Sequence, residues 1–312
     1  MKERGITQVP MAYHGGVDTD ASGSISEKNI KQFTKWTEEF LPEDYCGPVV
    51  MDYEQPWWNE LRAKTIHPDR LKEILSVYIE GVRIARGLRS TAGWGYWGFP
   101  ATRNTSSDWL EQGHSTESLI KQCRALYPEV YDCSRSVNRT VQVQNHITTV
   151  LSQAAGRIPV YVFVSPRYCG ENKDRSFFIP DDDFIRQVNA AMRATWMDHN
   201  NQEHRIKGLI LWDAYGYTPE SDWVSLDLKH RHYLELLVAL VNAWDKEMSG
   251  VEVITEPLYS ENCQEGLAEP TNSSEAIYDK SKTMKESDSV QSDKVKDNRV
   301  PSRRLPNEEV PR

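Results

Sequence analysis

Residues 49–58 read VVMDYEQPWW, an apolar run that ends in two carboxylates followed by two tryptophans. The apolar run predicts a buried β-strand, because parallel strands covered on both faces are almost continuously apolar. Side chains two residues apart on a strand point to the same side, so Asp52 and Glu54 should share one face and Tyr53 the other. Two like charges this close raise the pKa of at least one of them. The pattern favours a catalytic cleft, although an isolated D-x-E is more often a solvated strand end.

Short apolar, β-rich runs alternate with helical patterns along the rest of the chain. The predicted strands are residues 8–13, 48–54, 92–99, 128–132, 158–164 and 207–213. The predicted helices are residues 27–40, which follow a Ser26 cap, and residues 68–85, 116–125, 137–155, 183–197 and 226–244. A strand followed by a helix, repeated in this way, predicts parallel strands covered by helices.

An open doubly wound sheet and a closed barrel both fit this alternation. The chain has no G-x-G-x-x-G or G-x-x-x-x-G-K motif after a strand, so the usual nucleotide-binding reasons for an open sheet are missing. Polar and aromatic residues follow the predicted strands, and in a barrel those strand ends share one face. We therefore expect an α/β fold, a TIM-like (β/α) barrel over residues 1–250, with its active site on that face.

Composition narrows the class further. The net charge of −9 argues against nucleic acid as the main partner, and no apolar run is long enough for a membrane span. The five cysteines form no C-x-x-C pair, which argues against a zinc site and a dense disulfide framework. Residues 251–312 are rich in Ser, Glu, Lys, Asp and Pro and lack an apolar period, so we expect a disordered low-complexity tail.

Five sequence blocks resemble, in order and spacing, the hyaluronidase family of glycoside hydrolases (family 56). They are GPVVMDYEQPWW, TAGWGYWGFPATRN, ALYPEVY, IPVYVFVSPRY and GLILWDAYGY, and the resemblance extends over residues 9–244. It implies the seven-stranded variant of the barrel, with the first strand missing or displaced here, because residues 8–13 resemble the family's second strand. The family's cysteine after the aromatic strand is absent beyond Pro100, so the family disulfides are not expected.

The resemblance also implies a chemistry. Glu54 would be the general acid, and Asp52 would support the substrate's own N-acetyl group, whose carbonyl oxygen acts as the nucleophile. Such a retaining, substrate-assisted reaction needs no enzyme nucleophile, and hydrolysis would need no metal or other cofactor. Two acids two apart on one strand suit this scheme, because they act on one side of the bond.

The same resemblance and the aromatic strand ends supply the expected substrate-binding residues. These are Tyr131, Trp212, Trp97, Tyr96, Trp94, Tyr168 and Asp213. Trp97 stands where the family has a tyrosine. Arg167 and Tyr168 are expected either to meet a uronate carboxylate, because arginine suits bidentate carboxylate recognition, or to be ordinary loop residues.

The expected partner is hyaluronan, chondroitin or another N-acetylated polysaccharide, and the acidic balance of the chain favours a neutral glycan. Two alternatives remain: a catalytically silent barrel that binds glycans, and an open α/β protein in which both acids are surface residues. The first sixteen residues contain no apolar segment of a secretory signal. A secreted or lysosomal location is implied by the resemblance if the true start lies upstream.

Overall fold

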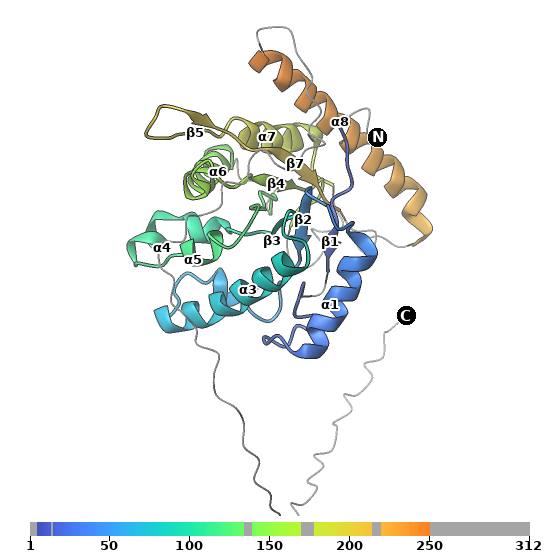
Figure 1. The fold of residues 1–312 in the computed structure, drawn as a ribbon. Coiled ribbons are helices and arrows are strands. Elements are labelled where there is room, and N and C mark those ends of the chain that lie inside the picture. The colour runs from blue at the N-terminus through green and yellow to red at the C-terminus, as the bar shows by residue number, and fades with distance from the viewer. Residues whose placement is uncertain (1–4, 14, 134–138, 170–177, 214–219, 250–312) are drawn as a thin grey trace, which may run out of the picture. The chain divides into compact units, whose positions relative to one another are not determined.

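The computed structural model describes residues 5–13, 15–133, 139–169, 178–213 and 220–249 (Figure 1). The tail predicted for residues 251–312 lies outside the described residues. No helix among the described residues is long and apolar enough to cross a membrane.

Two parallel sheets form the centre of the described structure. In the first, β2 (Pro48–Met51) lies between β1 (Met11–Ala12) and β3 (Gly93–Tyr96). In the second, β4 (Tyr161–Val164) pairs with β7 (Gly208–Leu211). All five strands lie within the runs predicted from the sequence.

Residues 125–131 connect the two sheets through isolated parallel bridges. The bridges pair Trp97 with Tyr127, Leu126 with Val160 and Glu129 with Phe163. The parallel order across the described residues is therefore β1, β2, β3, residues 125–131, β4 and β7. No recorded strand pairing in the described ranges joins β7 to β1, so hydrogen bonds do not close the sheets into a barrel there.

Alternate residues of these strands face two different hydrophobic clusters. The inner cluster contains side chains from β1, β2, residues 125–131, β4 and β7, and from Trp97 directly after β3: Val50, Ala125, Tyr127, Tyr131 and Phe163, with Val9, Met11, Trp97, Ile210 and Trp212 packed against them. The larger outer cluster lies between the strands and the helices. Side chains of β1 and β7 thus pack against the same inner cluster, although the structure records no backbone pairing between these two strands among the described residues.

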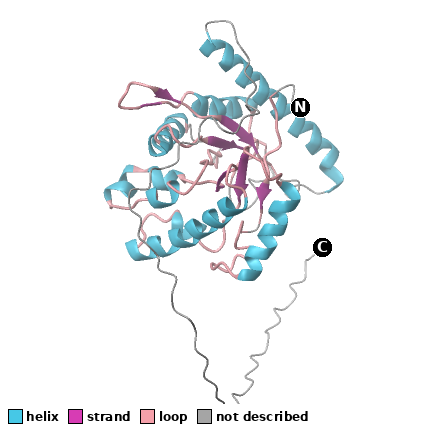
Figure 2. Ribbon diagram, viewed as in Figure 1, coloured by secondary structure: helices cyan, strands magenta, loops and turns pink. Residues whose placement is uncertain are grey.

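Helices follow the strands and cover their outer side (Figure 2). The long ones are α1 (Glu27–Phe40), α3 (Pro68–Leu88), α6 (Thr140–Ala154), α7 (Asp181–Met192) and α8 (Trp223–Ser249). The predicted Ser26 cap is confirmed: its hydroxyl accepts the Asn29 N–H, and the Asn29 side chain accepts the Ser26 N–H. This reciprocal pairing satisfies two amides that the first helical turn leaves without a partner.

One predicted helix is wrong beyond its first two-thirds. The helix predicted for residues 183–197 ends at Met192, and β5 (Trp196–Met197) pairs antiparallel with β6 (Glu203–His204). The Asp198 carboxylate accepts backbone N–H bonds from Asn200 and Gln202 and so stabilises the turn between them.

The remaining helical elements are short. The helix predicted at residues 116–125 is reduced to α5 (Glu117–Ile120). Further short elements were not predicted: α2 (Trp58–Leu61), η2 (Thr102–Thr105), α4 (Ser107–Glu111) and η5 (Glu220–Asp222).

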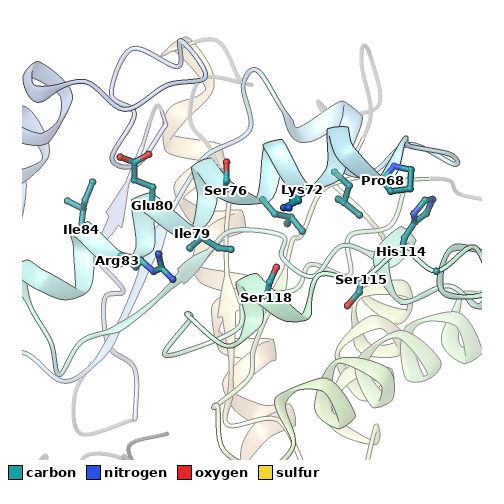
Figure 3. A pocket seen from close by; sticks show the side chains of 13 residues that line it. Pro68, Lys72, Ser76, Ile79, Glu80, Arg83, Ile84, His114, Ser115 and Ser118 are labelled. Carbon is teal, nitrogen blue, oxygen red and sulfur yellow. The ribbon is translucent and has the colours of Figure 1, made fainter. Parts of the chain in front are cut away.

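A cavity of about 760 Å³ lies between α3 and residues 113–118 (Figure 3). Leu71, Leu75 and Ile79 of α3 line it on one side, and His114 and Ser118 on the other. None of the residues predicted to bind substrate lines it. The candidate site must therefore be built from the strand ends themselves.

Candidate active site

The backbone at the end of β2 holds the two predicted catalytic carboxylates in place. The Asp52 N–H donates to the Ala12 carbonyl at 2.9 Å, and the Asp52 carbonyl accepts from the Gly15 N–H at 2.8 Å. Val50 belongs to the inner cluster and Met51 to the outer one, so the alternation of the strand directs Asp52 inward.

Tyr53, between the two acids, is fixed on the outer side. Its hydroxyl donates to Asp18 Oδ2 at 2.8 Å, and its carbonyl accepts from the Tyr78 hydroxyl of α3 at 2.8 Å. Its ring lies 4.9 Å from the Tyr78 ring between centroids. Anchoring the intervening residue at both ends restricts the backbone that carries Asp52 and Glu54.

The two carboxylates have different surroundings. Glu54 is exposed, whereas Asp52 is partly buried and its Oδ1 atom has no hydrogen-bond partner among the described residues. Burial, with a smaller contribution from the charge of Glu54, raises the pKa of Asp52 to about 7. The pair can therefore hold one proton near neutral pH, as general acid catalysis requires.

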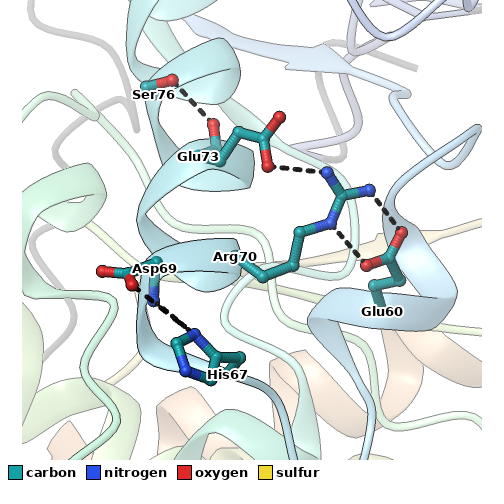
Figure 4. A network of polar contacts seen from close by, with 6 residues as sticks. All are labelled: Glu60, His67, Asp69, Arg70, Glu73 and Ser76. Carbon is teal, nitrogen blue, oxygen red and sulfur yellow. Dashed lines mark hydrogen bonds and ion pairs between the residues drawn. The ribbon is translucent and has the colours of Figure 1, made fainter.

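Helix α2 follows directly and is fastened to α3 (Figure 4). The Trp58 N–H donates to the Glu54 carbonyl at 2.8 Å. Arg70 of α3 contacts Glu60 of α2 at 2.7 Å and Glu73 of its own helix at 2.7 Å. These contacts fix the backbone on the far side of Glu54.

An aromatic wall stands beside the carboxylates. The rings of Tyr131 and Trp212 stack with centroids 6.2 Å apart and planes 15° apart. The Trp97 Nε1–H donates to the Tyr131 hydroxyl at 3.3 Å, and the Trp97 ring lies 5.6 Å from that of Trp58. Burial raises the pKa of Tyr131 well above its usual value. The negative charges of Glu129, Asp52 and Glu54 raise it further, so all three acids act on the Tyr131 hydroxyl.

Glu129 is a third carboxylate in this region that sequence reasoning missed. Its Oε2 atom accepts the Tyr131 N–H at 2.9 Å. Burial raises the pKa of Glu129, against the opposing effects of this hydrogen bond and of Arg139 and Arg62. Strand alternation in the sequence could have identified Glu129, because it lies two residues before Tyr131 on the same strand segment and must share its face.

Two predicted substrate-binding residues are corrected by the structure. Trp94 is fully buried, and its Nε1–H donates to the Arg89 carbonyl at 2.9 Å. Tyr96 is buried against α3, with its hydroxyl bonded to the Tyr78 carbonyl at 2.8 Å. Both belong to the outer cluster, because they alternate with the inward-facing Trp97 on the same strand. Neither side chain has a surface available to a sugar.

The predicted residues at the ends of β4 and β7 are bound to protein groups. Asp213 Oδ1 lies 2.6 Å from Arg167 Nε, and His230 of α8 contacts Asp213 Oδ2. Arg167 is 3% exposed, so the expected uronate contact is replaced by this internal ion pair. Tyr168 is also buried in the outer cluster, with its hydroxyl 3.4 Å from Asp183 Oδ2.

A disulfide between Cys133 and Cys169 joins the two segments that follow Tyr131 and Tyr168. The Cys169 N–H also donates to the Asp132 carbonyl at 2.7 Å. The chain beyond Tyr131 is therefore linked to the chain beyond β4 both covalently and by a hydrogen bond. Cys123 is a free, buried thiol.

The fold and site together define an α/β protein of parallel strands with outer helices, whose paired carboxylates and aromatic residues gather at the carboxyl ends of the strands. No family model matches the chain. Hyaluronidase PH-20 of Cavia porcellus is 21% identical over 226 residues, covering 57% of this chain. The chain spans only 40% of the length of that relative.

Solved structures agree on the fold. A monoclinic crystal structure of bee venom hyaluronidase matches 69% of this chain and 77% of its own, with a TM-score of 0.51 and 16% identity. Bee venom hyaluronidase in complex with a hyaluronic acid tetramer matches 69% and 75%, with a TM-score of 0.50 and 16% identity. The chain is a distant relative of the hyaluronidases, and it shares their fold.

Proposed function

We propose that this protein is an endo-acting glycoside hydrolase that cleaves a polysaccharide containing N-acetylhexosamine, with hyaluronan as the first substrate to test. The single observation that carries the proposal is the Asp52–Glu54 pair. One acid is partly buried with an orphaned oxygen and a pKa of about 7, and the other is exposed two residues away beside aromatic rings. The hyaluronic acid tetramer bound to the bee venom enzyme supports a glycosaminoglycan substrate.

The parallel strand order supports a (β/α) barrel as the frame of the site. Side chains of β1 and β7 both pack against the inner cluster, as the interior residues of a barrel do. The seven-stranded variant, with its first strand missing or displaced in this chain, is the form that we propose.

In the proposed mechanism, Glu54 protonates the glycosidic oxygen while the acetamido carbonyl oxygen of the substrate attacks the anomeric carbon. The bond to the leaving sugar breaks, and water later opens the cyclic intermediate with Glu54 as the base, so the configuration is retained. Asp52 accepts the acetamido N–H, and the Tyr131 hydroxyl donates a hydrogen bond nearby. Trp212 and Trp97 provide apolar faces for the sugar rings.

The distribution of the proton follows from the surroundings of the two acids. In the protein without substrate, burial raises the pKa of Asp52 to about 7, so Asp52 can carry the proton. A bound acetamido N–H stabilises the ionised form of Asp52, whereas a leaving sugar that covers Glu54 removes water and disfavours a charge on that carboxylate. Substrate binding would thus shift the shared proton toward Glu54, where the reaction needs it.

The test is product release from hyaluronan, chondroitin and an uncharged N-acetylglucosamine polymer at acidic to neutral pH. Glu54→Gln should lower kcat by about 10²- to 10⁴-fold, the usual contribution of general acid–base catalysis, and leave binding intact. Glu43→Gln, which changes another exposed glutamate, should behave as wild type. Binding without turnover in the wild type would instead identify a silent glycan-binding protein. The absence of both binding and turnover would reject the proposal.

A further inference from the structure

Tyr131 is bound to charged side chains through both sides of its main chain. Its N–H donates to Glu129 Oε2 at 2.9 Å. Its carbonyl accepts a hydrogen bond from Arg139 Nη1. The two charged groups therefore attach to successive peptide units at the point where the strand segment ends.

The local hydrogen-bond ladder explains why such support is needed. The Val130 N–H still donates to the Phe163 carbonyl of β4 at 3.1 Å. Odd-numbered residues of the segment face the other neighbour: the Tyr127 N–H donates to the Phe99 carbonyl at 3.1 Å, whereas the Tyr131 N–H, further along the same side, donates to the Glu129 carboxylate. A buried backbone N–H without a partner is costly, so Glu129 substitutes for the missing strand neighbour.

Arg139 is itself held in position. It is the N-cap residue of α6, and its Nε–H donates to the Gln142 side chain at 3.1 Å. Its positive charge also opposes the ionisation penalty of the partly buried Glu129. Each of the two side chains holds one peptide unit of Tyr131, and the charge of Arg139 favours the ionised form of Glu129 that accepts the Tyr131 N–H.

The side chain of Tyr131 makes the contacts that the proposed function uses: its ring stacks on Trp212, and its hydroxyl oxygen accepts the Trp97 Nε1–H. We propose that Glu129 and Arg139 form a clamp on the Tyr131 main chain and act as positioning residues for the Tyr131 hydroxyl and the Trp212 stack. This inference rests on the proposed function. It assigns Glu129 a role through Tyr131 rather than a direct part in bond cleavage.

Gly98 allows the Trp58 ring to approach the backbone closely, next to Glu129. A Cβ atom at Gly98 would lie 2.8 Å from the Trp58 ring and 3.7 Å from Glu129 Cγ, and its backbone φ of +70° is one that glycine tolerates. The aromatic wall and the clamp thus pack against each other at this glycine, and a displaced Glu129 would disturb both.

The experiment compares Glu129→Ala, Glu129→Gln and Arg139→Met with wild type. Hydrogen exchange of the Tyr131 amide and kcat/KM are measured in parallel, together with affinity for an N-acetylated oligosaccharide by tryptophan fluorescence. Glu129→Ala should accelerate exchange at Tyr131 at least about 10-fold and lower kcat/KM by about 10- to 100-fold, because small displacements of positioned groups have effects of this size. Glu129→Gln keeps an acceptor oxygen, so it should recover most of the Tyr131 exchange protection and most of kcat/KM.

Glu117→Gln, which breaks an exposed ion pair with Lys121, is the matched control and should change neither readout. Unchanged Tyr131 exchange and unchanged affinity in both Glu129→Ala and Arg139→Met would overturn the clamp. If Glu129→Ala does not fold, Tyr131 exchange and oligosaccharide affinity in Glu129→Gln and Arg139→Met test the clamp instead. A wild type without turnover would reject the proposed function alone, because exchange and oligosaccharide affinity still test the clamp.

Discussion

Arg167 and Asp213 form a buried ion pair, with Arg167 Nε 2.6 Å from Asp213 Oδ1 and side-chain exposures of 3% and 5%. The pair joins the segment after β4 to the segment after β7. His230 of α8 contacts the second carboxylate oxygen, so the same acid also binds a covering helix. This contact explains how the carboxyl ends of two neighbouring strands are held together beside Trp212.

Asp213→Asn should lower the free energy of unfolding by about 3–5 kcal/mol, because it removes the negative charge of a buried ion pair with Arg167. Urea unfolding at pH 7 measures the change. The control is Asp227→Asn, which removes an exposed pair with Arg231 at 3.9 Å and should cost less than about 1 kcal/mol. Equal losses of unfolding free energy in the two variants would show that burial of the Arg167–Asp213 pair does not determine its contribution to stability.

Asp52→Asn should change the pH dependence of stability. Because the folded-state pKa of Asp52 is raised from 3.8 to about 7, its protonation stabilises the fold fully below pH 3.8, and this stabilisation is lost as the pH rises through about 7. Asparagine never ionises, so the variant should match wild type at pH 4. At pH 8 it should be more stable, by at most about 4 kcal/mol and by less to the extent that water reaches the carboxylate.

Urea unfolding at pH 4, 6 and 8 tests this expectation. Glu43→Gln, which neutralises an exposed glutamate, serves as the control and should show no comparable pH-dependent gain. An Asp52→Asn variant that is no more stable than wild type at pH 8 would contradict the raised pKa.

The same pKa predicts the pH profile of turnover. In the free protein, loss of the proton shared by Asp52 and Glu54 should lower kcat/KM about tenfold for each pH unit above about pH 7. The measurement is kcat/KM on the best substrate from pH 4 to pH 9, in buffers of constant ionic strength. A profile that is flat through pH 7 would place the essential proton elsewhere.

Much of the framework was predictable from the sequence, because apolar runs and helical periods identify long elements. The strands at Pro48–Met51 and Gly208–Leu211 lie within their predicted runs, and Ser26 caps its helix as expected. The hairpin of β5 and β6 was missed, since each strand is only two residues long and follows a helical pattern. Its signal was the polar run 198–202 that forms the turn.

The candidate site was predictable only in part. Period-two alternation alone would have placed Trp94 and Tyr96 on the outer face once Trp97 was assigned to the inner one. The same rule would have added Glu129 to the site through Tyr131. The Arg167–Asp213 pair could not be predicted in this way, because the two residues are 46 apart in sequence and meet only through the pairing of β4 with β7.

Trp212→Ala should weaken glycan binding without unfolding the protein. Trp212 is partly buried and stacks on Tyr131, so part of the indole stays accessible to a sugar ring. An aromatic stacking contact contributes about 0.5–1.5 kcal/mol beyond area burial, so Kd for an N-acetylated oligosaccharide should rise up to about tenfold, and Trp212→Phe should recover part of the loss. Isothermal titration calorimetry measures Kd.

Trp223→Ala, which removes a 40% exposed tryptophan at the start of α8, should bind as wild type. Equal affinities of Trp212→Ala and Trp223→Ala would remove Trp212 from the proposed sugar subsite.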